Sequence, residues 1–170
     1  MGEDDILEVI KKGDVAVLPT DTLYALVGSA LLPEAIDRIY DLKHRAPNKP
    51  LIVLIADVDN LEQFGVVLSE ELRRVLGGYW PGPYSIILPT IDEEFSYLSR
   101  CGGTIAFRLP DKDDLRELIR ATGPLVAPSA NPEGHPPART IAEAQKYFGT
   151  DVDFYDDGGE LGGKPSTIIE

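Results

Sequence analysis

The sequence contains one cysteine, one tryptophan, two histidines and no long uninterrupted apolar run. The lone thiol, Cys101, cannot form an intrachain disulfide and stands beside two glycines, a setting that is more often structural than catalytic, so we assign it no role. A membrane-spanning helix needs about 20 consecutive apolar residues, and the sequence has no such run. Residues 1–5, MGEDD, are acidic where a secretory signal would be basic. We therefore expect a cytoplasmic protein that does not contact a membrane.

Several common catalytic and cofactor motifs are absent as well. The chain has neither a G-x-x-x-x-G-K-[ST] phosphate loop nor a G-x-G-x-x-G dinucleotide fingerprint, and it has no G-x-S-x-G nucleophile elbow. His44 and His135 lack a set of neighbouring cysteine, histidine or aspartate residues at metal-ligand spacing, so we expect no dedicated metal site. The acidic groups at 92–94 and 111–114 are expected on solvated faces or at helix starts.

Positive charge is scarce. The chain has 16 lysines and arginines against 29 aspartates and glutamates, a formal net charge of -13. Binding to a nucleic-acid backbone relies on spread basic surface, so this balance counts against an RNA-binding module, which would need a basic concave face and would bind RNA with salt-sensitive affinity. A local basic pocket inside an acidic shell remains compatible with the composition.

Helical and strand patterns alternate along the chain. Apolar spacing and capping residues predict helices at 3–12, 33–43, 69–76 and 112–121, and a further one from the capping box at 140–143 to Gly149. Short apolar runs predict strands at 15–18, 51–55, 84–88, 104–109, 125–127, 152–155 and 166–169, with another apolar stretch at 23–27. The run LIVLI at 51–55 is typical of a central strand covered on both faces. The alternation favours one layered α/β domain over residues 1–170.

The loop KHRAPNKP at 43–50 concentrates positive charge against the trend of the chain. Lys43, Arg45 and Lys49 lie within seven residues that contain no acid. Point charges together with planar bidentate donors suit a triphosphate, so this loop could clamp one. A solvated loop whose cations pair with surface acids is the alternative from the loop alone.

Arg108 lies in a second candidate segment, TIAFRLP at 104–110. Strand alternation places Thr104 and Arg108 on the same face and Ile105, Phe107 and Leu109 on the other. An arginine on a strand face lined by small residues often has an anionic partner, which could be the carboxylate of a ligand or a nearby aspartate. Thr104 could reach the same ligand.

Small polar residues follow two further predicted strands or loops. Ser129 and Asn131 come after the strand at 125–127, at a carboxyl end, where open α/β sheets tend to bind ligands. Ser166 follows the loop GGKP at 162–165. Such side chains offer donors with little bulk, and the alternative is that they stabilise turns.

Six segments in this order resemble the YrdC-like family of threonylcarbamoyl-adenylate synthases along nearly the whole chain. They are PTDTLYAL at 19–26, KHRAPNKPLIVLI at 43–55, WPGP at 80–83, TIAFRLP at 104–110, APSAN at 127–131 and PSTII at 165–169. The resemblance implies a twisted open mixed sheet flanked by helices, in a short single-domain form. It also implies synthesis of threonylcarbamoyl-AMP and pyrophosphate from L-threonine, bicarbonate or carbon dioxide, and ATP with Mg²⁺. The product would pass to the proteins that complete the t6A modification of tRNA.

The resemblance assigns roles to particular residues. It implies catalytic roles for Lys43 and Arg45, threonine contacts from Thr20, Arg108, Ser129 and Ser166, and ATP contacts from Arg45, Lys49, Thr104, Asn131 and Arg139. Many relatives carry a histidine where this chain has Leu54. Two other enzymes remain as alternatives, namely a member of the YciO-like sister branch and a carbamoyltransfer enzyme that uses carbamoyl phosphate.

Overall fold

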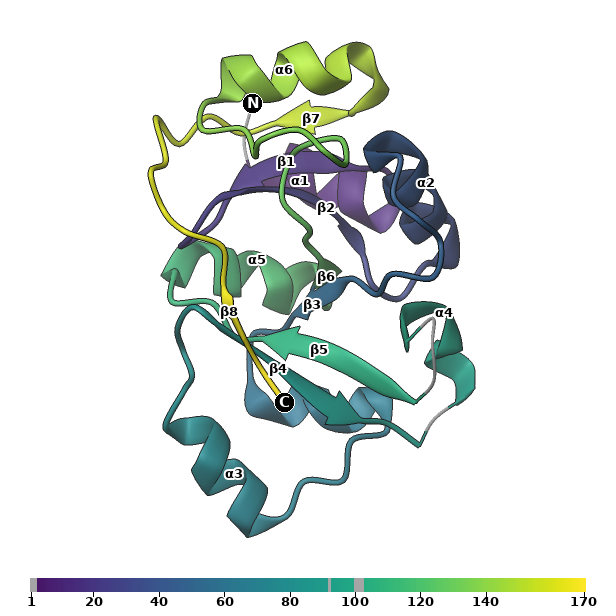
Figure 1. Cartoon of the computed structure of the whole chain (residues 1–170), viewed down its shortest axis with the longest axis vertical. Helices are drawn as coiled ribbons and strands as arrows, with labels where there is room; N and C mark the ends of the chain where they lie inside the picture. Colours follow the sequence, from purple (N-terminus) through teal and green to yellow (C-terminus); the bar gives the residue numbers. More distant parts are fainter. Residues whose placement is uncertain (1–2, 92, 100–102) are drawn as a thin grey trace.

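The computed structural model describes residues 3–91, 93–99 and 103–170, so Cys101 and Asp92 lie outside the described residues. Helices and strands alternate as expected (Figure 1). In chain order they are α1 (Glu3–Lys11), β1 (Ala16–Pro19), β2 (Tyr24–Ser29), α2 (Pro33–Lys43), β3 (Ile52–Leu54), the 3-10 helix η1 (Val58–Phe64), α3 (Glu70–Gly77), β4 (Tyr84–Pro89), η2 (Glu93–Phe95), α4 (Ser96–Ser99), β5 (Thr104–Arg108), α5 (Asp113–Thr122), β6 (Leu125–Val126), α6 (Ile141–Phe148), η3 (Gly149–Asp151), β7 (Phe154–Tyr155) and β8 (Thr167–Ile169).

The predicted helices and strands are confirmed, with ends that differ by one or two residues, and the apolar stretch at 23–27 lies mostly in β2. The capping predictions also hold, because Ser69 accepts a hydrogen bond from the backbone of Leu72 and Thr140 accepts one from Glu143. The sequence analysis missed η1, η2, α4 and η3. Each has one or two turns, which is too short to show a helical period. The acids Glu93 and Glu94 are exposed at the start of η2, as expected.

All eight strands form one mixed sheet in the order β7-β1-β2-β6-β3-β5-β4-β8. The pairs β1–β7, β3–β5 and β4–β8 are parallel, and the other four pairs are antiparallel. The predicted central strand is confirmed, because β3 lies between β6 and β5 and Val53 is fully buried. Open ends at β7 and β8 confirm the expected open mixed sheet.

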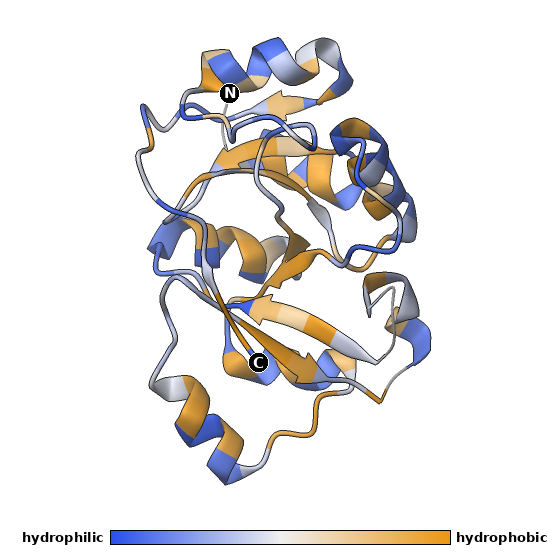
Figure 2. Ribbon diagram, viewed as in Figure 1, coloured by the Kyte–Doolittle hydropathy of each residue, from blue (hydrophilic) through white to orange (hydrophobic). Residues whose placement is uncertain are grey.

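Strand alternation sorts the apolar side chains into two clusters, one on each face of the sheet. In β1, Val17 packs into the larger cluster, while Ala16 and Leu18 pack into the smaller one with α1 and α5. The larger cluster includes Ile36 and Ile39 of α2. Figure 2 shows mostly apolar colours on the strands and a mixture of apolar and hydrophilic colours along the helices. Among the described residues, no helix is long and apolar enough to cross a membrane.

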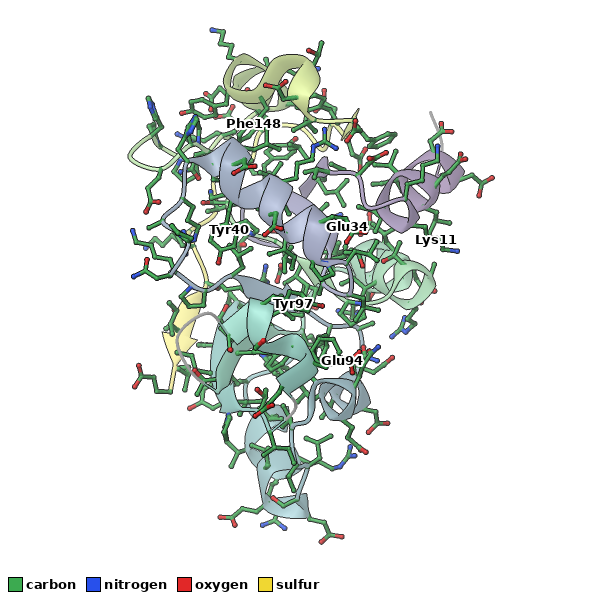
Figure 3. All side chains as sticks on the ribbon, turned by 90° about the vertical axis from the view of Figure 1, so that its right-hand side faces the viewer. Lys11, Glu34, Tyr40, Glu94, Tyr97 and Phe148 are labelled. Carbon is green, nitrogen blue, oxygen red and sulfur yellow. The ribbon has the colours of Figure 1, made fainter. Side chains whose placement is uncertain are left out.

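The short helix α4 is attached through Tyr97 to the segment between β2 and α2. The Tyr97 hydroxyl donates a hydrogen bond to the carbonyl of Ala30 at 2.7 Å. Burial, together with the smaller effects of the negative charges of Glu94 and Glu34, raises the pKa of Tyr97 to about 12. Figure 3 shows Tyr97 beside α2, on the side where Glu34 lies. This contact links α4 to the segment that leads from β2 into α2.

Candidate functional site

A cavity of about 210 Å³ lies where five segments of the chain meet. These are the turn between β1 and β2, the start of β3 with its preceding loop, the end of β5, the loop after β6, and the segment that leads into β8. It brings together five residues that the sequence analysis selected: Thr20, Arg45, Arg108, Ser129 and Ser166. No acidic residue is among the lining residues.

Thr20 shapes the turn that forms one wall of the cavity. It is 5% exposed, and its hydroxyl donates to the carbonyl of Leu23 at 2.6 Å. The same oxygen accepts hydrogen bonds from the backbone N–H groups of Thr22 and Leu23, both at 3.1 Å. These bonds hold the turn in place and leave the threonine side chain at the cavity wall.

Arg45 supplies a cation with unused hydrogen-bonding capacity. The chain turns into the loop after α2 at His44, whose φ of 52° lies in the left-handed region. Nη2 of Arg45 donates to the carbonyl of Pro50 at 2.9 Å. Its Nε is buried and has no hydrogen-bond partner among the described residues. A buried N–H without an acceptor is costly, so this guanidinium fits an anionic ligand in the cavity.

Lys43 lies behind the cavity wall and does not line it. Its side chain is 2% exposed, and Nζ donates to the carbonyls of Ser129 at 2.5 Å and Asn131 at 2.8 Å. Burial and, to a smaller extent, the charge of Arg45 lower the pKa of Lys43 to about 8, and Glu133 acts in the opposite direction. Lys43 thus joins the end of α2 to the loop after β6.

The loop at 129–131 combines the two roles that the sequence analysis left open, which are ligand binding and stabilisation of a turn. Ser129 Oγ donates to Oδ1 of Asn131 at 2.5 Å, and Nδ2 of Asn131 donates to the carbonyls of Pro132 and His135. Asn131 therefore stabilises a turn and does not line the cavity, whereas Ser129 does both. Thr20 and Ser129 follow the carboxyl ends of β1 and β6, which run in the same direction because both are antiparallel to β2.

Arg108 is buried, with 5% of its side chain exposed, and the expected alternation of β5 is confirmed. Ile105 and Phe107 pack into the larger apolar cluster, whereas Arg108 faces the cavity. Its Nη1 is 2.5 Å from Oδ1 of Asp21, so the aspartate that the sequence analysis left as one alternative is present. A ligand carboxylate at the same guanidinium stays a prediction.

Four other predicted residues do not line this cavity. Lys49 forms an ion pair with Glu133, and this pairing lowers the pKa of Glu133. Arg139 is exposed, 3.5 Å from a carboxylate oxygen of Glu160. Thr104 is exposed at the start of β5, at the opposite end of that strand from Arg108, and Asn131 is the fourth. Their contacts with ATP stay predictions.

Sequence reasoning selected Ser166 but did not predict the path of residues 156–165, which Figure 1 shows as a long connection from β7 at one edge of the sheet towards β8 at the other. Tyr24 holds it, because its hydroxyl accepts from the N–H of Gly158 at 2.9 Å and donates to the carbonyl of Gly159 at 2.6 Å. A Cβ on Gly163 would overlap the carbonyl of Thr22. The segment therefore passes so close to the turn between β1 and β2 that only glycine fits at position 163. In the sequence, the PTDTLY and GGKP segments were the features that could have indicated this contact.

Leu54, where many relatives carry a histidine, lies outside the cavity. Leu54 is 1% exposed in the smaller apolar cluster and does not line the cavity. Within the described ranges, no group of three or more His, Cys, Asp or Glu residues could hold a metal ion. A second cavity of about 260 Å³ lies between α1 and α5 and contains none of the predicted residues.

The sequence is similar to proteins named threonylcarbamoyl-AMP synthase. The relative from Pyrococcus abyssi is 33% identical over 164 residues, which are 95% of this chain and 48% of that protein. The relative from Pseudomonas aeruginosa PAO1 is 34% identical over 166 residues, which are 94% of this chain and 87% of that protein. The chain thus spans about half the length of the first relative and most of the second.

Solved structures and a family profile agree with these similarities. P. abyssi Sua5 complexed with L-threonine has a TM-score of 0.89 and 32% identity, covering 96% of this chain and 49% of that one. Escherichia coli YciO has a TM-score of 0.86 and 26% identity, covering 98% of this chain and 82% of that one. The profile of the Sua5/YciO/YrdC family, described as telomere recombination, matches residues 8–170. The chain, with its cavity at the meeting point of the family-like segments, therefore belongs to the Sua5/YciO/YrdC family.

Proposed function

We propose that this chain is a threonylcarbamoyl-AMP synthase that transfers the adenylyl group of ATP to a carbamate derived from L-threonine. The observation that carries the proposal is the cavity itself, in which two arginines and four small hydroxyl side chains meet without any acid among the lining residues. Such a set of donors suits anionic substrates. The names of the relatives and the threonine-bound Sua5 structure support the same reaction.

The reaction needs no general base at its second step. The amino group of threonine first attacks carbon dioxide, or bicarbonate with loss of water, and forms a C–N bond as a proton leaves the nitrogen. A carbamate oxygen, already anionic, then attacks the α-phosphorus of ATP. The bond from the α-phosphorus to the bridging oxygen breaks and pyrophosphate leaves. The protein must therefore hold the reactants close together and neutralise their charge. Fixed arginines and hydroxyls can do both.

We assign the threonine end to the part of the cavity near Thr20, Arg108, Ser129 and Ser166. Ser166 is held by a hydrogen bond of 2.6 Å between its Oγ and Oγ of Ser85 in β4. Three hydroxyls and a guanidinium could bind the carboxylate, amino and hydroxyl groups of one small amino acid. The cavity, at about 210 Å³, fits a ligand of that size and is below the usual range for larger ligands.

ATP would extend from Arg45 onto the more open surface beside the cavity. Arg45 would neutralise charge at the α-phosphate or its neighbours, and Lys49, Thr104 and Arg139 are exposed and accessible to a larger ligand. Asn131 and Lys43 would act on the ligand through the loop at 129–131, which both hold. Mg²⁺ would arrive with the triphosphate as part of the substrate.

The wider role follows from the product. Threonylcarbamoyl-AMP is an activated acyl adenylate, and we infer that the chain passes it to the proteins that complete t6A in tRNA in the cytoplasm. The net charge of -13 supports a chain that does not hold the tRNA by itself.

The test is to incubate the purified chain with Mg-ATP, L-threonine and bicarbonate, and to measure pyrophosphate release together with the mass of the nucleotide product. We expect release that depends on threonine and a product with the mass of threonylcarbamoyl-AMP. No release, or release that is independent of threonine, contradicts the proposal. Activity with carbamoyl phosphate in place of threonine and bicarbonate would instead favour carbamoyl transfer.

A further inference from the structure

Asp21 lies in the turn between β1 and β2 and uses both of its carboxylate oxygens. Oδ1 is 2.5 Å from Nη1 of Arg108, and Oδ2 accepts the backbone N–H of Asp111 at 3.0 Å. Its side chain is 10% exposed and that of Arg108 is 5% exposed. The bond from Nη2 of Arg108 to Thr22 Oγ1, at 3.5 Å, is at the limit of hydrogen-bond distance.

The ion pair joins two parts of the sheet that are not direct neighbours. In the strand order, β6 and β3 separate β2 from β5. Asp21 nevertheless binds both the last residue of β5 and the backbone three residues further on. Thr20 and Thr22 from the turn and Arg108 from β5 all line the cavity. Asp21 therefore sets the distance between the two cavity walls to which they belong.

The same pair fixes the charge of the cavity. Arg45 and Arg108 are the two cations among the lining residues, and Asp21 neutralises Arg108. Arg45 forms no ion pair within the described residues, so the positive charge available to an anion is that of Arg45. A guanidinium has five N–H donors in a rigid plane, and a carboxylate on one edge leaves the other donors aimed in a fixed direction.

From this geometry we propose that Asp21 is a positioning residue for threonine: it orients the guanidinium of Arg108 as a neutralised, fixed hydrogen-bond donor to the threonine carboxylate. The inference rests on the proposed function, because threonine is the ligand. Without the Asp21 carboxylate, Arg108 keeps its charge but loses its orientation. Threonine affinity should fall, while ATP affinity, which depends on Arg45, should not.

The test compares Asp21→Asn with a matched control in isothermal titrations of the full chain with L-threonine and, separately, with ATP. The control is Asp153→Asn, since Asp153 also accepts from an arginine and from a backbone N–H but lies away from the cavity. Its Oδ2 accepts from Arg38 Nη1 at 2.6 Å and from the backbone of Val15 at 3.1 Å. We expect Asp21→Asn to raise the Kd for threonine about tenfold and to leave that for ATP within about twofold. Asp153→Asn should change neither.

The outcomes separate the inference from the proposed function. If the unaltered chain does not bind threonine, the proposed function fails and this inference fails with it. If the unaltered chain binds threonine and Asp21→Asn binds it equally well, or loses threonine and ATP affinity alike, the inference alone is wrong. Should Asp21→Asn fail to fold, Asp21→Glu replaces it: the longer side chain keeps the charge but displaces the carboxylate, and unchanged threonine affinity would overturn the proposal.

Discussion

The buried ammonium of Lys43 makes the stability of the fold depend on pH in a defined direction. Burial lowers its pKa from an ordinary value of 10.5 to about 8. Between these values the unfolded chain binds a proton at this group that the folded chain does not, so stability rises with pH across the window from 8 to 10.5. At about 1.4 kcal/mol per pH unit, charging Lys43 in the folded state costs about 3 kcal/mol at neutral pH.

Replacement of Lys43 by Met isolates this effect. The substitution keeps an unbranched side chain one atom shorter than lysine and removes the donor to the carbonyls of Ser129 and Asn131, which costs stability at every pH. It also removes the titrating group. The difference in free energy of unfolding, unaltered chain minus variant, should therefore grow by about 2.5 kcal/mol between pH 7 and pH 10. Measuring a difference cancels the tyrosines and other lysines that titrate in both proteins.

The assay is urea unfolding, followed by circular dichroism at pH 7, 8, 9 and 10. Lys12→Met is the matched control, because Lys12 is an exposed lysine just after α1 and pairs with Glu8 on the surface. Its stability difference should stay constant over the same range. A Lys43→Met difference that is equally constant would refute the reasoning, since it would show that the lysine is not desolvated in the folded chain.

Three further predictions concern the cavity and the fold around it. Arg45→Ala should lower threonine-dependent pyrophosphate release by about 10²-fold or more while thermal unfolding shifts little, because the one side-chain hydrogen bond that Arg45 makes to the described residues is to the carbonyl of Pro50. A loss of stability like that of a core mutation would indicate a structural role instead. Gly163→Ala should destabilise the chain and weaken threonine binding, because the new methyl group overlaps the carbonyl of Thr22, and unchanged stability in urea would contradict that close approach. Tyr97→Phe should cost about 1 kcal/mol at pH 7 through loss of the bond to Ala30. Because the folded pKa of Tyr97, about 12, exceeds the ordinary value of 10, the unaltered chain should lose stability as pH rises from 10 to 12. The variant should lose less stability over that range, since only Tyr24 and Tyr155, whose pKa values are also raised, still contribute.

Patterns in the chain were enough to predict most of the secondary structure and five of the residues that line the cavity. A helix period, a capping serine or an alternating strand depends on residues within a few positions of one another, and such rules placed α3, α6 and β5 correctly. The alternation in TIAFRLP also showed that Arg108 would stand apart from the apolar core. Ordered family-like segments indicated which residues would share one cavity, and Thr20, Arg45, Arg108, Ser129 and Ser166 do so.

The partners of those residues depended on contacts between distant parts of the chain. Arg108 meets Asp21 across 87 positions and Lys43 meets the loop at 129–131 across 86 to 88, because the strand order brings these segments together. No local rule ranks Asp21 above the other acids as the partner of Arg108, since that choice is made by the turn after β1 and the position of β5. The burial of Lys43 also depends on contacts between distant segments. The sequence predicts Lys43 as one cation of a solvated loop, and only packing under residues 129–131 removes it from water and from the cavity surface.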